Sequence, residues 1–110
     1  MKIVVIGVSG LIGSTVFKTL RAREGWQVFG TLRSEGNLSF FPGALRNEFV
    51  TNLDVLDTDA LMAAMGRLRP DVIVNCAGLT KHMEGAYNPL LALPINSLFP
   101  HRLHAIAQLF

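Results

Sequence analysis

The sequence predicts an α/β fold in which a mostly parallel sheet lies between layers of helices. Short apolar runs of strand length alternate along the chain with segments of helical periodicity. The first apolar run, at residues 3–6, leads directly into a glycine-rich turn at residues 7–13 with the spacing G-x-x-G-x-x-G. Right-handed crossovers between successive strands then give the expected spatial order 3-2-1-4.

The first part of the chain contains two expected strands and one helix. Residues 2–6 form the first strand, and a helix from residue 11 to about residue 23 is closed by Gly25. Residues 26–32 form the second strand, and 33–43 form a loop or at most a short helical turn. The apolar face of the helix is expected to contain Leu11, Val16, Phe17 and Leu20.

The middle of the chain contains a short third strand near residues 49–51, followed by a helix and a fourth strand. Asp57 is a suitable N-cap for this helix, and the Arg-Pro pair at 69–70 stops it before the strand at 71–75. The apolar residues of this helix are Leu61, Met62, Met65 and Leu68.

The last part of the chain is predicted to be a loop at 76–94 and a helix at 95–109. Pro100 lies inside this helix, so the regular helix either begins or bends there. Its apolar positions are Leu98, Leu103, Ile106 and Ala107.

The composition is that of one globular unit over residues 1–110, with half the residues apolar and 16% charged. The net charge is only +2 and basic residues are scattered, so we expect no nucleic-acid partner. Met1 leads almost directly into the first strand, without a secretion signal or membrane span, which favours a cytoplasmic protein with no membrane partner. The single cysteine, Cys76, fits a reducing compartment.

The glycine turn has the chemistry of a dinucleotide-binding loop. Gly7 allows a sharp exit from the strand, Gly10 lets backbone N–H groups approach a pyrophosphate, and Gly13 lets the helix pack closely on the sheet. The helix N-terminus adds about half a positive charge. We therefore assign the turn to a dinucleotide, with six contact residues: Gly7, Ser9, Gly10, Leu11, Ile12 and Gly13.

Arg33 follows the second strand, where such folds place an acidic residue for a ribose hydroxyl or a basic one for a 2′-phosphate. A guanidinium can bind a phosphate in bidentate fashion and Ser34 can add a hydroxyl, so NADP is favoured and NAD remains an alternative. Glu35, two positions on, could still reach a ribose. A surface arginine after a strand also needs no ligand.

Two further groups lie after strands at the same predicted edge. Asp54 and the Val55 backbone could contact adenine, although Asp54 could equally be a turn residue or helix cap. Cys76, Ala77 and Gly78 are small enough for a flat cofactor to lie against the backbone, but they also suit an ordinary turn. Cys76 alone is more typical of a small buried hydrophobe than of a reactive thiol.

Few residues are candidates for catalysis or metal binding. His101 and His104 lie three apart on one helix face, but no third ligand is suitably spaced, so we predict no metal site. Lys81, His82 and Glu84 lie in the loop beyond the fourth strand, where a substrate could pass; a solvated loop is the alternative.

Four segments together resemble the N-terminal half of an extended short-chain dehydrogenase/reductase, closest to the dTDP-4-dehydrorhamnose reductases and related sugar-nucleotide reductases. They are residues 7–13, Asp54-Val55, residues 69–78 with the following Thr80, and Ile95-Asn96. The resemblance implies an incomplete, three-layer Rossmann-like domain that binds NAD(P). It also implies that Asn96 supports the active site from behind. Cofactor contacts are implied for Cys76, Ala77, Gly78, Leu79 and Thr80.

Two departures from that family bear on activity. Where those reductases have an acidic stretch, this chain has Lys81-His82-Met83-Glu84-Gly85-Ala86-Tyr87. The identity of the sugar substrate is therefore left undetermined. The family's general acid is a tyrosine with a lysine four residues later, but Leu91 lies four residues after Tyr87, the only tyrosine. We expect no catalytic residue within 1–110, and a chain that ends before the catalytic strand and the substrate-binding part: a fragment or the ordered part of a longer enzyme.

The leading hypothesis is therefore the cofactor-binding portion of an NADP-dependent reductase acting on a nucleotide-linked keto-sugar. In the intact protein the partner would be a nucleotide-sugar substrate. A homodimer is a further possibility. One alternative is a catalytically silent NADP-binding module that senses redox state; a Tyr-x-x-x-Lys in the following native sequence would favour the reductase over it. A nucleotide-sugar epimerase or dehydratase is the other, and would need a tightly retained cofactor.

Overall fold

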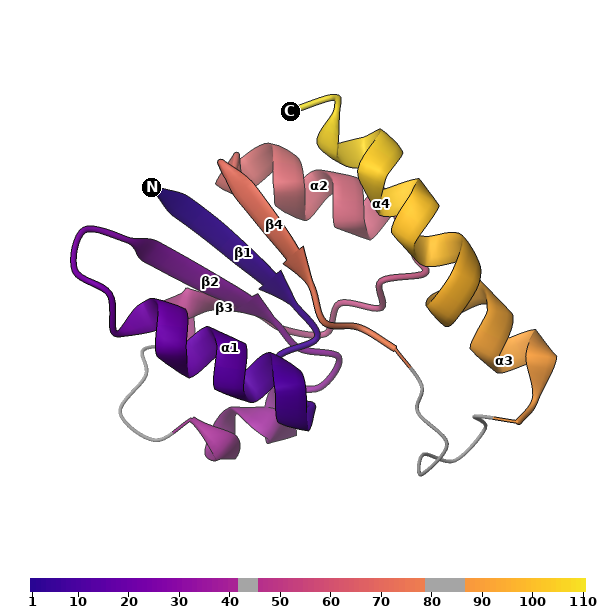
Figure 1. The fold of residues 1–110 in the computed structure, drawn as a ribbon, viewed down its shortest axis with the longest axis horizontal. Coiled ribbons are helices and arrows are strands. Elements are labelled where there is room, and N and C mark those ends of the chain that lie inside the picture. The colour runs from indigo at the N-terminus through magenta and orange to yellow at the C-terminus, as the bar shows by residue number, and fades with distance from the viewer. Residues whose placement is uncertain (42–45, 79–86) are drawn as a thin grey trace.

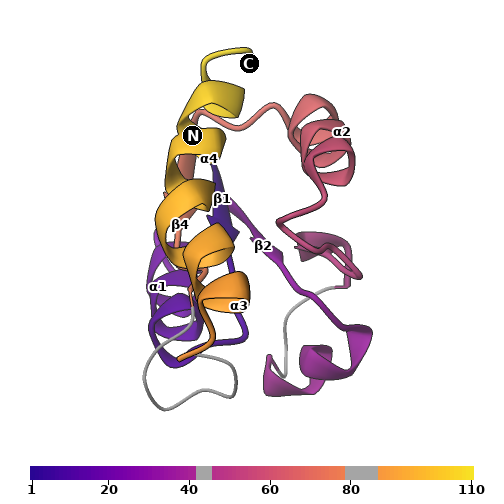
Figure 2. The same cartoon turned by 90° about the vertical axis from the view of Figure 1, so that its right-hand side faces the viewer.

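The computed structural model describes residues 1–41, 46–78 and 87–110. A four-stranded parallel sheet has the order β3-β2-β1-β4, which confirms the predicted α/β class and strand order. Helices cover both faces of the sheet, and Figure 2 shows the sheet between α1 and α2. The strands are β1 (Lys2–Ile6), β2 (Gln27–Thr31), β3 (Phe49–Val50) and β4 (Val72–Asn75).

The helical elements follow the strands in the alternation that the sequence predicts (Figure 1). Three of the elements are α-helices of nine or more residues, and the others are short 3₁₀, α or π segments. They are α1 (Leu11–Arg21), η1 (Glu35–Phe40), η2 (Arg46–Glu48), α2 (Thr58–Leu68), α3 (Pro89–Leu93), η3 (Pro94–Leu98) and α4 (Phe99–Ala107). Among the described residues, no helix is long and apolar enough to cross a membrane.

β1 is the central strand, and its side chains alternate between two separate cores. Ile3 and Val5 lie in the core beneath α1, whereas Val4 and Ile6 lie in the core beneath α2 and α4. Because both faces are covered, all four side chains are buried. This explains why β1 is a continuous apolar run without polar alternation.

The core on the α1 face is built around three aromatic rings. Phe17 of α1 lies 5.4 Å from the ring centroid of Phe41 and 5.0 Å from that of Phe49. Phe41 and Phe49 are themselves 5.0 Å apart. Aromatic contacts of this kind stabilise beyond the area they bury, so Phe41 anchors the end of the short η1 segment to this core.

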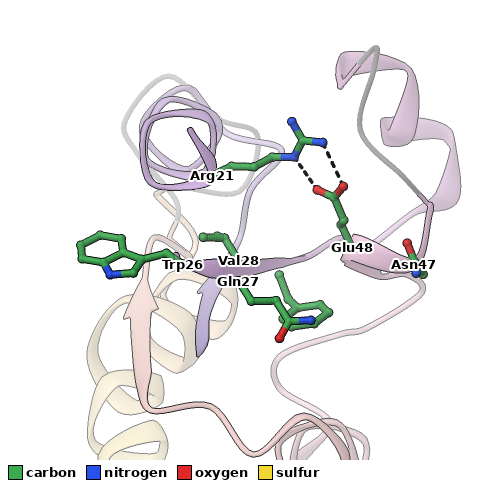
Figure 3. Close-up of a pocket in the computed structure, with 7 residues that line it drawn as sticks. Arg21, Trp26, Gln27, Val28, Asn47 and Glu48 are labelled. Carbon is green, nitrogen blue, oxygen red and sulfur yellow. Dashed lines mark hydrogen bonds and ion pairs between the residues drawn. The ribbon is translucent and has the colours of Figure 1, made fainter. Parts of the chain in front are cut away.

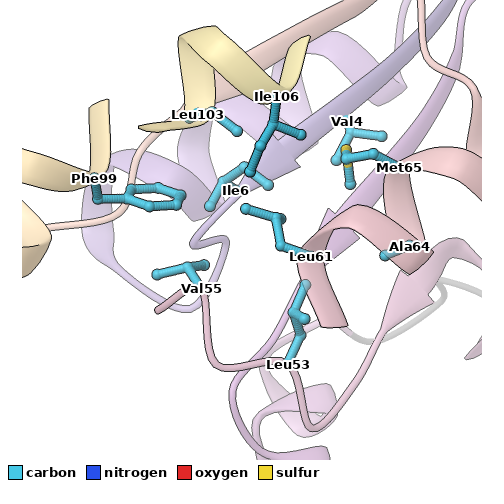
Figure 4. Close-up of a cluster of buried hydrophobic side chains, with 10 residues drawn as sticks. All are labelled: Val4, Ile6, Leu53, Val55, Leu61, Ala64, Met65, Phe99, Leu103 and Ile106. Carbon is cyan, nitrogen blue, oxygen red and sulfur yellow. The ribbon is translucent and has the colours of Figure 1, made fainter. Parts of the chain in front are cut away.

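The core on the other face joins α2 and α4 to β1 (Figure 4). Leu61 and Met65 of α2 meet Leu103 and Ile106 of α4 over Ile6. All five side chains are buried. The last helix is therefore held by the same core as the β3–β4 crossover.

Two details of α1 differ from the sequence prediction. The helix ends at Arg21 rather than near residue 23, and Gly25 adopts a left-handed conformation in the following turn, with φ +83°. Leu11 is 86% exposed, so its placement on the buried face was wrong. Leu11 is the first residue of the helix, beyond the edge of the sheet, whereas Phe17 is buried as expected.

The final helical region begins earlier than predicted. Helix starts at Pro89, so residues 89–94 are not loop, and α4 ends at Ala107 rather than residue 109. The Asn88 side chain accepts a hydrogen bond from the Leu90 N–H at 3.0 Å. The pair Asn88-Pro89 is a recognisable helix start, with an N-cap asparagine followed by proline at the first helical position.

Pro100 lies in the first turn of α4, so the regular α-helix begins at this proline, one of the two alternatives that the sequence allowed. Since Pro100 has no N–H to donate to the Asn96 carbonyl, the preceding residues form the π-turn η3, in which the Phe99 N–H donates to the Pro94 carbonyl. The wider turn shifts the buried face by one position. Phe99 is fully buried and Leu98 is 56% exposed, which corrects the predicted apolar face.

Polar side chains hold both ends of α2. The Asp57 carboxylate accepts a hydrogen bond from the Ala60 N–H at 3.1 Å, which confirms its predicted capping role. At the other end the Lys2 ammonium donates to the Leu68 carbonyl at 2.8 Å, and Arg69 has a left-handed φ of 49°. A cation and a left-handed residue are both favourable at a helix C-terminus.

We expect Asp57→Ala to lower the free energy of unfolding by about 1 kcal/mol, because it removes the cap of α2. Asp59→Ala is the matched control, since Asp59 carries the same charge in the same helical turn but does not cap. Urea unfolding followed by circular dichroism measures both variants. Equal losses in the two would contradict the capping role.

Candidate functional site

The predicted ligand edge of the sheet is held together by backbone hydrogen bonds. The Gly7 N–H donates to the Thr31 hydroxyl at 3.1 Å, and the Val8 N–H donates to the Thr31 carbonyl at 3.2 Å. The Cys76 N–H donates to the Ile6 carbonyl at 2.9 Å. The carboxyl ends of β2, β1 and β4 therefore meet at the glycine turn.

Two of the three glycines are required by contacts with backbone. Gly7 has a left-handed φ of +78°, and a Cβ there would lie 3.0 Å from the Ala77 Cα. A Cβ on Gly13 would lie only 2.0 Å from the Gly7 carbonyl oxygen. The turn and the start of α1 thus lie directly against the end of β1, as the spacing predicts.

Gly10 lies in a different environment, open on the side that a ligand would occupy. A Cβ there would have only the Gly7 carbonyl oxygen within reach, at 4.0 Å. α1 has no side-chain cap and no acidic residue in its first turn. Leu11 and Ile12 are exposed. The first-turn N–H groups and the helix dipole suit a diphosphate, so these residues fit the predicted cofactor.

The residues after β2 are placed where the 2′ position of an adenosine ribose is expected. Arg33 and Ser34 are both exposed. The Ser34 hydroxyl oxygen accepts a hydrogen bond from the Gly36 N–H at 3.3 Å and caps η1. Its own O–H can still donate to a phosphate oxygen.

Glu35, the acidic alternative at this position, is engaged by a cation. Its Oε1 accepts hydrogen bonds from the Arg46 guanidinium at 2.5 Å and from the Thr51 hydroxyl at 3.4 Å. The pKa of the Glu35 carboxyl is lowered, chiefly by the hydrogen bond from Arg46 and then by its charge. Sequence reasoning missed this pair, because the partners are 11 positions apart and belong to different elements, η1 and η2.

Asp54 takes part in a turn, which is the alternative role that the sequence allowed. Its carboxylate accepts from the Leu56 N–H at 3.0 Å, and its carbonyl accepts from the Asp57 N–H at 2.9 Å. Asp54 is nevertheless exposed, whereas the Val55 side chain is buried in the core. Adenine contact by Asp54 and the Val55 backbone stays a prediction.

The end of β4 is shaped by two asparagines. Asn75 Oδ1 accepts from the Ala77 N–H at 3.0 Å, which turns the chain out of the strand. Asn96 Oδ1 lies 3.2 Å from where a Gly78 Cβ would be, so the π-turn packs its asparagine against this segment. Leu79 and Thr80 lie outside the described residues.

Cys76 is partly buried beside this turn, and burial raises the pKa of its thiol. The thiol form is therefore favoured over the thiolate at neutral pH. This agrees with the interpretation of Cys76 as a small apolar side chain.

The described residues contain no cluster of side chains that could hold a metal ion. His101 and His104 are exposed, and no group of three metal-ligating residues occurs in the described ranges. Tyr87 is 83% exposed. Lys81, His82 and Glu84, with the rest of 79–86, lie outside the described residues.

A surface hollow of about 490 Å³ lies away from this edge (Figure 3). It is found at the amino ends of β2 and β3, and its most prominent contact is the Arg21–Glu48 ion pair that joins α1 to η2. Gln27 also lines it. Ligands of parallel α/β sheets bind at the carboxyl ends of the strands, so the hollow is not the cofactor site.

The fold and the glycine turn together define a dinucleotide-binding protein of the Rossmann type. Residues 3–108 match the NAD dependent epimerase/dehydratase family, and the chain belongs to that family. Its enzymes are nicotinamide-dinucleotide dependent, which agrees with the predicted short-chain dehydrogenase/reductase class.

Three known proteins show how far the similarity extends. The chain is 30% identical over 104 residues to a probable low-salt glycan biosynthesis reductase of Haloferax volcanii, covering 94% of this chain and 32% of that protein. L-threonine dehydrogenase of Clostridium difficile has a TM-score of 0.76 at 29% identity, covering 97% and 33% of the two chains. A hypothetical dTDP-4-dehydrorhamnose reductase of Sulfolobus tokodaii has a TM-score of 0.72 at 21% identity, covering 99% and 36%. The chain thus spans about a third of their length.

Gly13→Ala should cost at least about 3 kcal/mol of unfolding free energy, because its Cβ would overlap the Gly7 carbonyl and force α1 away from β1. Gly10→Ala is the control in the same turn, with an ordinary φ and open space, and should cost at most about 1 kcal/mol. Urea unfolding compares the two. Equal stability of the variants would show that the close approach is not required.

Alkylation of Cys76 by iodoacetamide at pH 8 should be several-fold slower in the folded chain than in urea. The folded thiol has the raised pKa, so less reactive thiolate is present than in the unfolded chain at the same pH. Because Cys76 is the single cysteine, mass spectrometry measures its rate directly. Equal rates in the two states would contradict burial of the thiol.

Proposed function

We propose that this chain is the cofactor-binding part of an NADP-dependent reductase that acts on a nucleotide-linked keto-sugar. The observation that carries the proposal is the open Gly10 turn at the uncapped start of α1, with Arg33 exposed at the neighbouring strand end. Family membership supports a nicotinamide cofactor. The similarity to the probable low-salt glycan biosynthesis reductase of Haloferax volcanii supports a reduction within glycan biosynthesis.

Each part of the site has a separate task in this proposal. First-turn N–H groups of α1 bind the diphosphate, and Arg33 with Ser34 binds the 2′-phosphate. Asp54 and the Val55 backbone contact adenine. Ala77 and Gly78 offer backbone along the rest of the cofactor, and Asn96 packs against Gly78 from the π-turn. The family resemblance assigns a further contact to Leu79.

The bound cofactor would supply a hydride to the carbonyl carbon of the sugar. The general acid would come from residues outside this chain, since Leu91 lies where a lysine paired with Tyr87 would be needed. The 110-residue chain therefore binds cofactor but does not turn over substrate.

The family description also supports a second function, epimerisation or dehydration of a nucleotide sugar. Such reactions return the hydride to the same substrate, so the cofactor must be retained between steps. Purified full-length protein would then carry bound dinucleotide, whereas a reductase would exchange it freely. Release of dinucleotide on denaturation distinguishes the two functions.

Arg33→Ala should lower the ratio of NADPH to NADH affinity about tenfold, the equivalent of one charge-assisted hydrogen bond. Cofactor fluorescence titration of the folded chain measures both affinities. Arg67→Ala is the matched control, because Arg67 is an exposed arginine in the last turn of α2, at the opposite edge of the sheet. An unchanged affinity ratio in Arg33→Ala would contradict the proposal that Arg33 binds the 2′-phosphate.

A further inference from the structure

The segment between β2 and β3 carries three charged side chains at the edge where the adenosine half of the cofactor is proposed to bind. Arg33 and Glu35 flank the Ser34 cap, and Arg46 reaches Glu35 from η2. The Leu32 N–H donates to the Val50 carbonyl at 2.8 Å, which fixes this segment beside β3. Glu35 is tied to the carboxyl end of β3 by the Thr51 hydroxyl, and the Arg46 side chain reaches it from η2, which precedes that strand.

Without Arg46, Glu35 would place a negative charge at this edge. A carboxylate shortly after the second strand is what dinucleotide-binding folds use to bind the ribose hydroxyl of NAD. The same carboxylate would weaken the binding of a 2′-phosphate at this edge, because two negative charges repel each other. Glu35 alone would therefore oppose the preference that Arg33 is expected to confer.

The pair geometry cancels that charge at one particular oxygen. Glu35 Oε1 accepts both the Arg46 guanidinium at 2.5 Å and the Thr51 hydroxyl at 3.4 Å. Both partners of the ion pair are exposed, with relative side-chain exposures of 48% for Glu35 and 64% for Arg46. An exposed ion pair contributes little to the free energy of folding. We therefore look for its effect in the affinity for the cofactor.

We propose that Arg46 is a specificity-determining residue that acts through Glu35, cancelling the carboxylate and so permitting a 2′-phosphate beside Arg33. This inference rests on the proposed NADP-binding function and deepens it. Arg46 is a positioning and charge-neutralising residue; direct contact with the cofactor is assigned to Arg33 and Ser34.

The test is a double-mutant cycle in the folded 110-residue chain, with NADPH and NADH affinities measured by cofactor fluorescence. Arg46→Gln should lower the NADPH to NADH affinity ratio about fivefold, since it exposes the Glu35 carboxylate. Glu35→Gln should leave the ratio equal or higher. The double variant should return to within about twofold of the wild-type ratio, because no carboxylate remains to repel the phosphate.

Two outcomes would contradict the role of Arg46 while leaving the proposed function intact. An unchanged ratio in Arg46→Gln, with Arg33→Ala lowering it, shows that Arg46 has no part in specificity. A double variant as impaired as Arg46→Gln shows that Arg46 acts directly on the phosphate rather than through Glu35.

Controls separate the remaining explanations. Arg67→Gln removes the same charge from the opposite edge and should leave the ratio unchanged. The urea midpoints of the Glu35 and Arg46 variants should equal that of the wild type, so that a folding defect does not imitate lost specificity. Binding of neither dinucleotide by the wild-type chain would overturn the proposed function, and the inference with it.

Discussion

Residue 13 carries no side chain, and this absence determines how α1 meets β1. A Cβ there would lie 2.0 Å from the Gly7 carbonyl oxygen, so only glycine lets the helix begin directly above the strand end. The approach brings the first-turn N–H groups of α1 to the carboxyl edge of the sheet, between the ends of β2 and β4. Anion binding at this edge depends on that arrangement.

The rest of the molecule keeps this edge in place. The two cores pack against opposite faces of β1. One contains the Phe17, Phe41 and Phe49 rings, and the other contains side chains of α2 and α4. Thr31 ties the end of β2 to the glycine turn with its hydroxyl and its carbonyl. Within the described residues, the site is therefore built largely from backbone held by buried apolar packing.

Local signals allowed the sequence to predict the sheet, its strand order and the conformational roles of Gly7 and Gly13. Residues 3–6 of β1 are buried and form an apolar run, and Asp57 caps α2 where a capping residue was expected. The errors come from longer-range effects. The π-turn before Pro100 moves Phe99 into the core and Leu98 out of it, because one wider turn rotates every later side chain.

The candidate site was only partly predictable for the same reason. The positions of Gly10 and Arg33 follow from the strand ends, which sequence periodicity locates. The Glu35–Arg46 contact does not, because its partners lie in two different elements and no sequence periodicity relates them. Asn88-Pro89 is a different case, since that helix start was readable from local chemistry and was overlooked.

The position of the bound dinucleotide is the most direct test of the proposed cofactor site. A two-dimensional NMR titration of the ¹⁵N-labelled chain with NADPH would locate it through changes in the backbone amide signals. We expect the largest shifts at Leu11, Ile12 and Gly13, whose amides lie in the first turn of α1. Shifts confined to the hollow around Arg21, Gln27 and Glu48, or no saturable shifts from a folded chain, would contradict it.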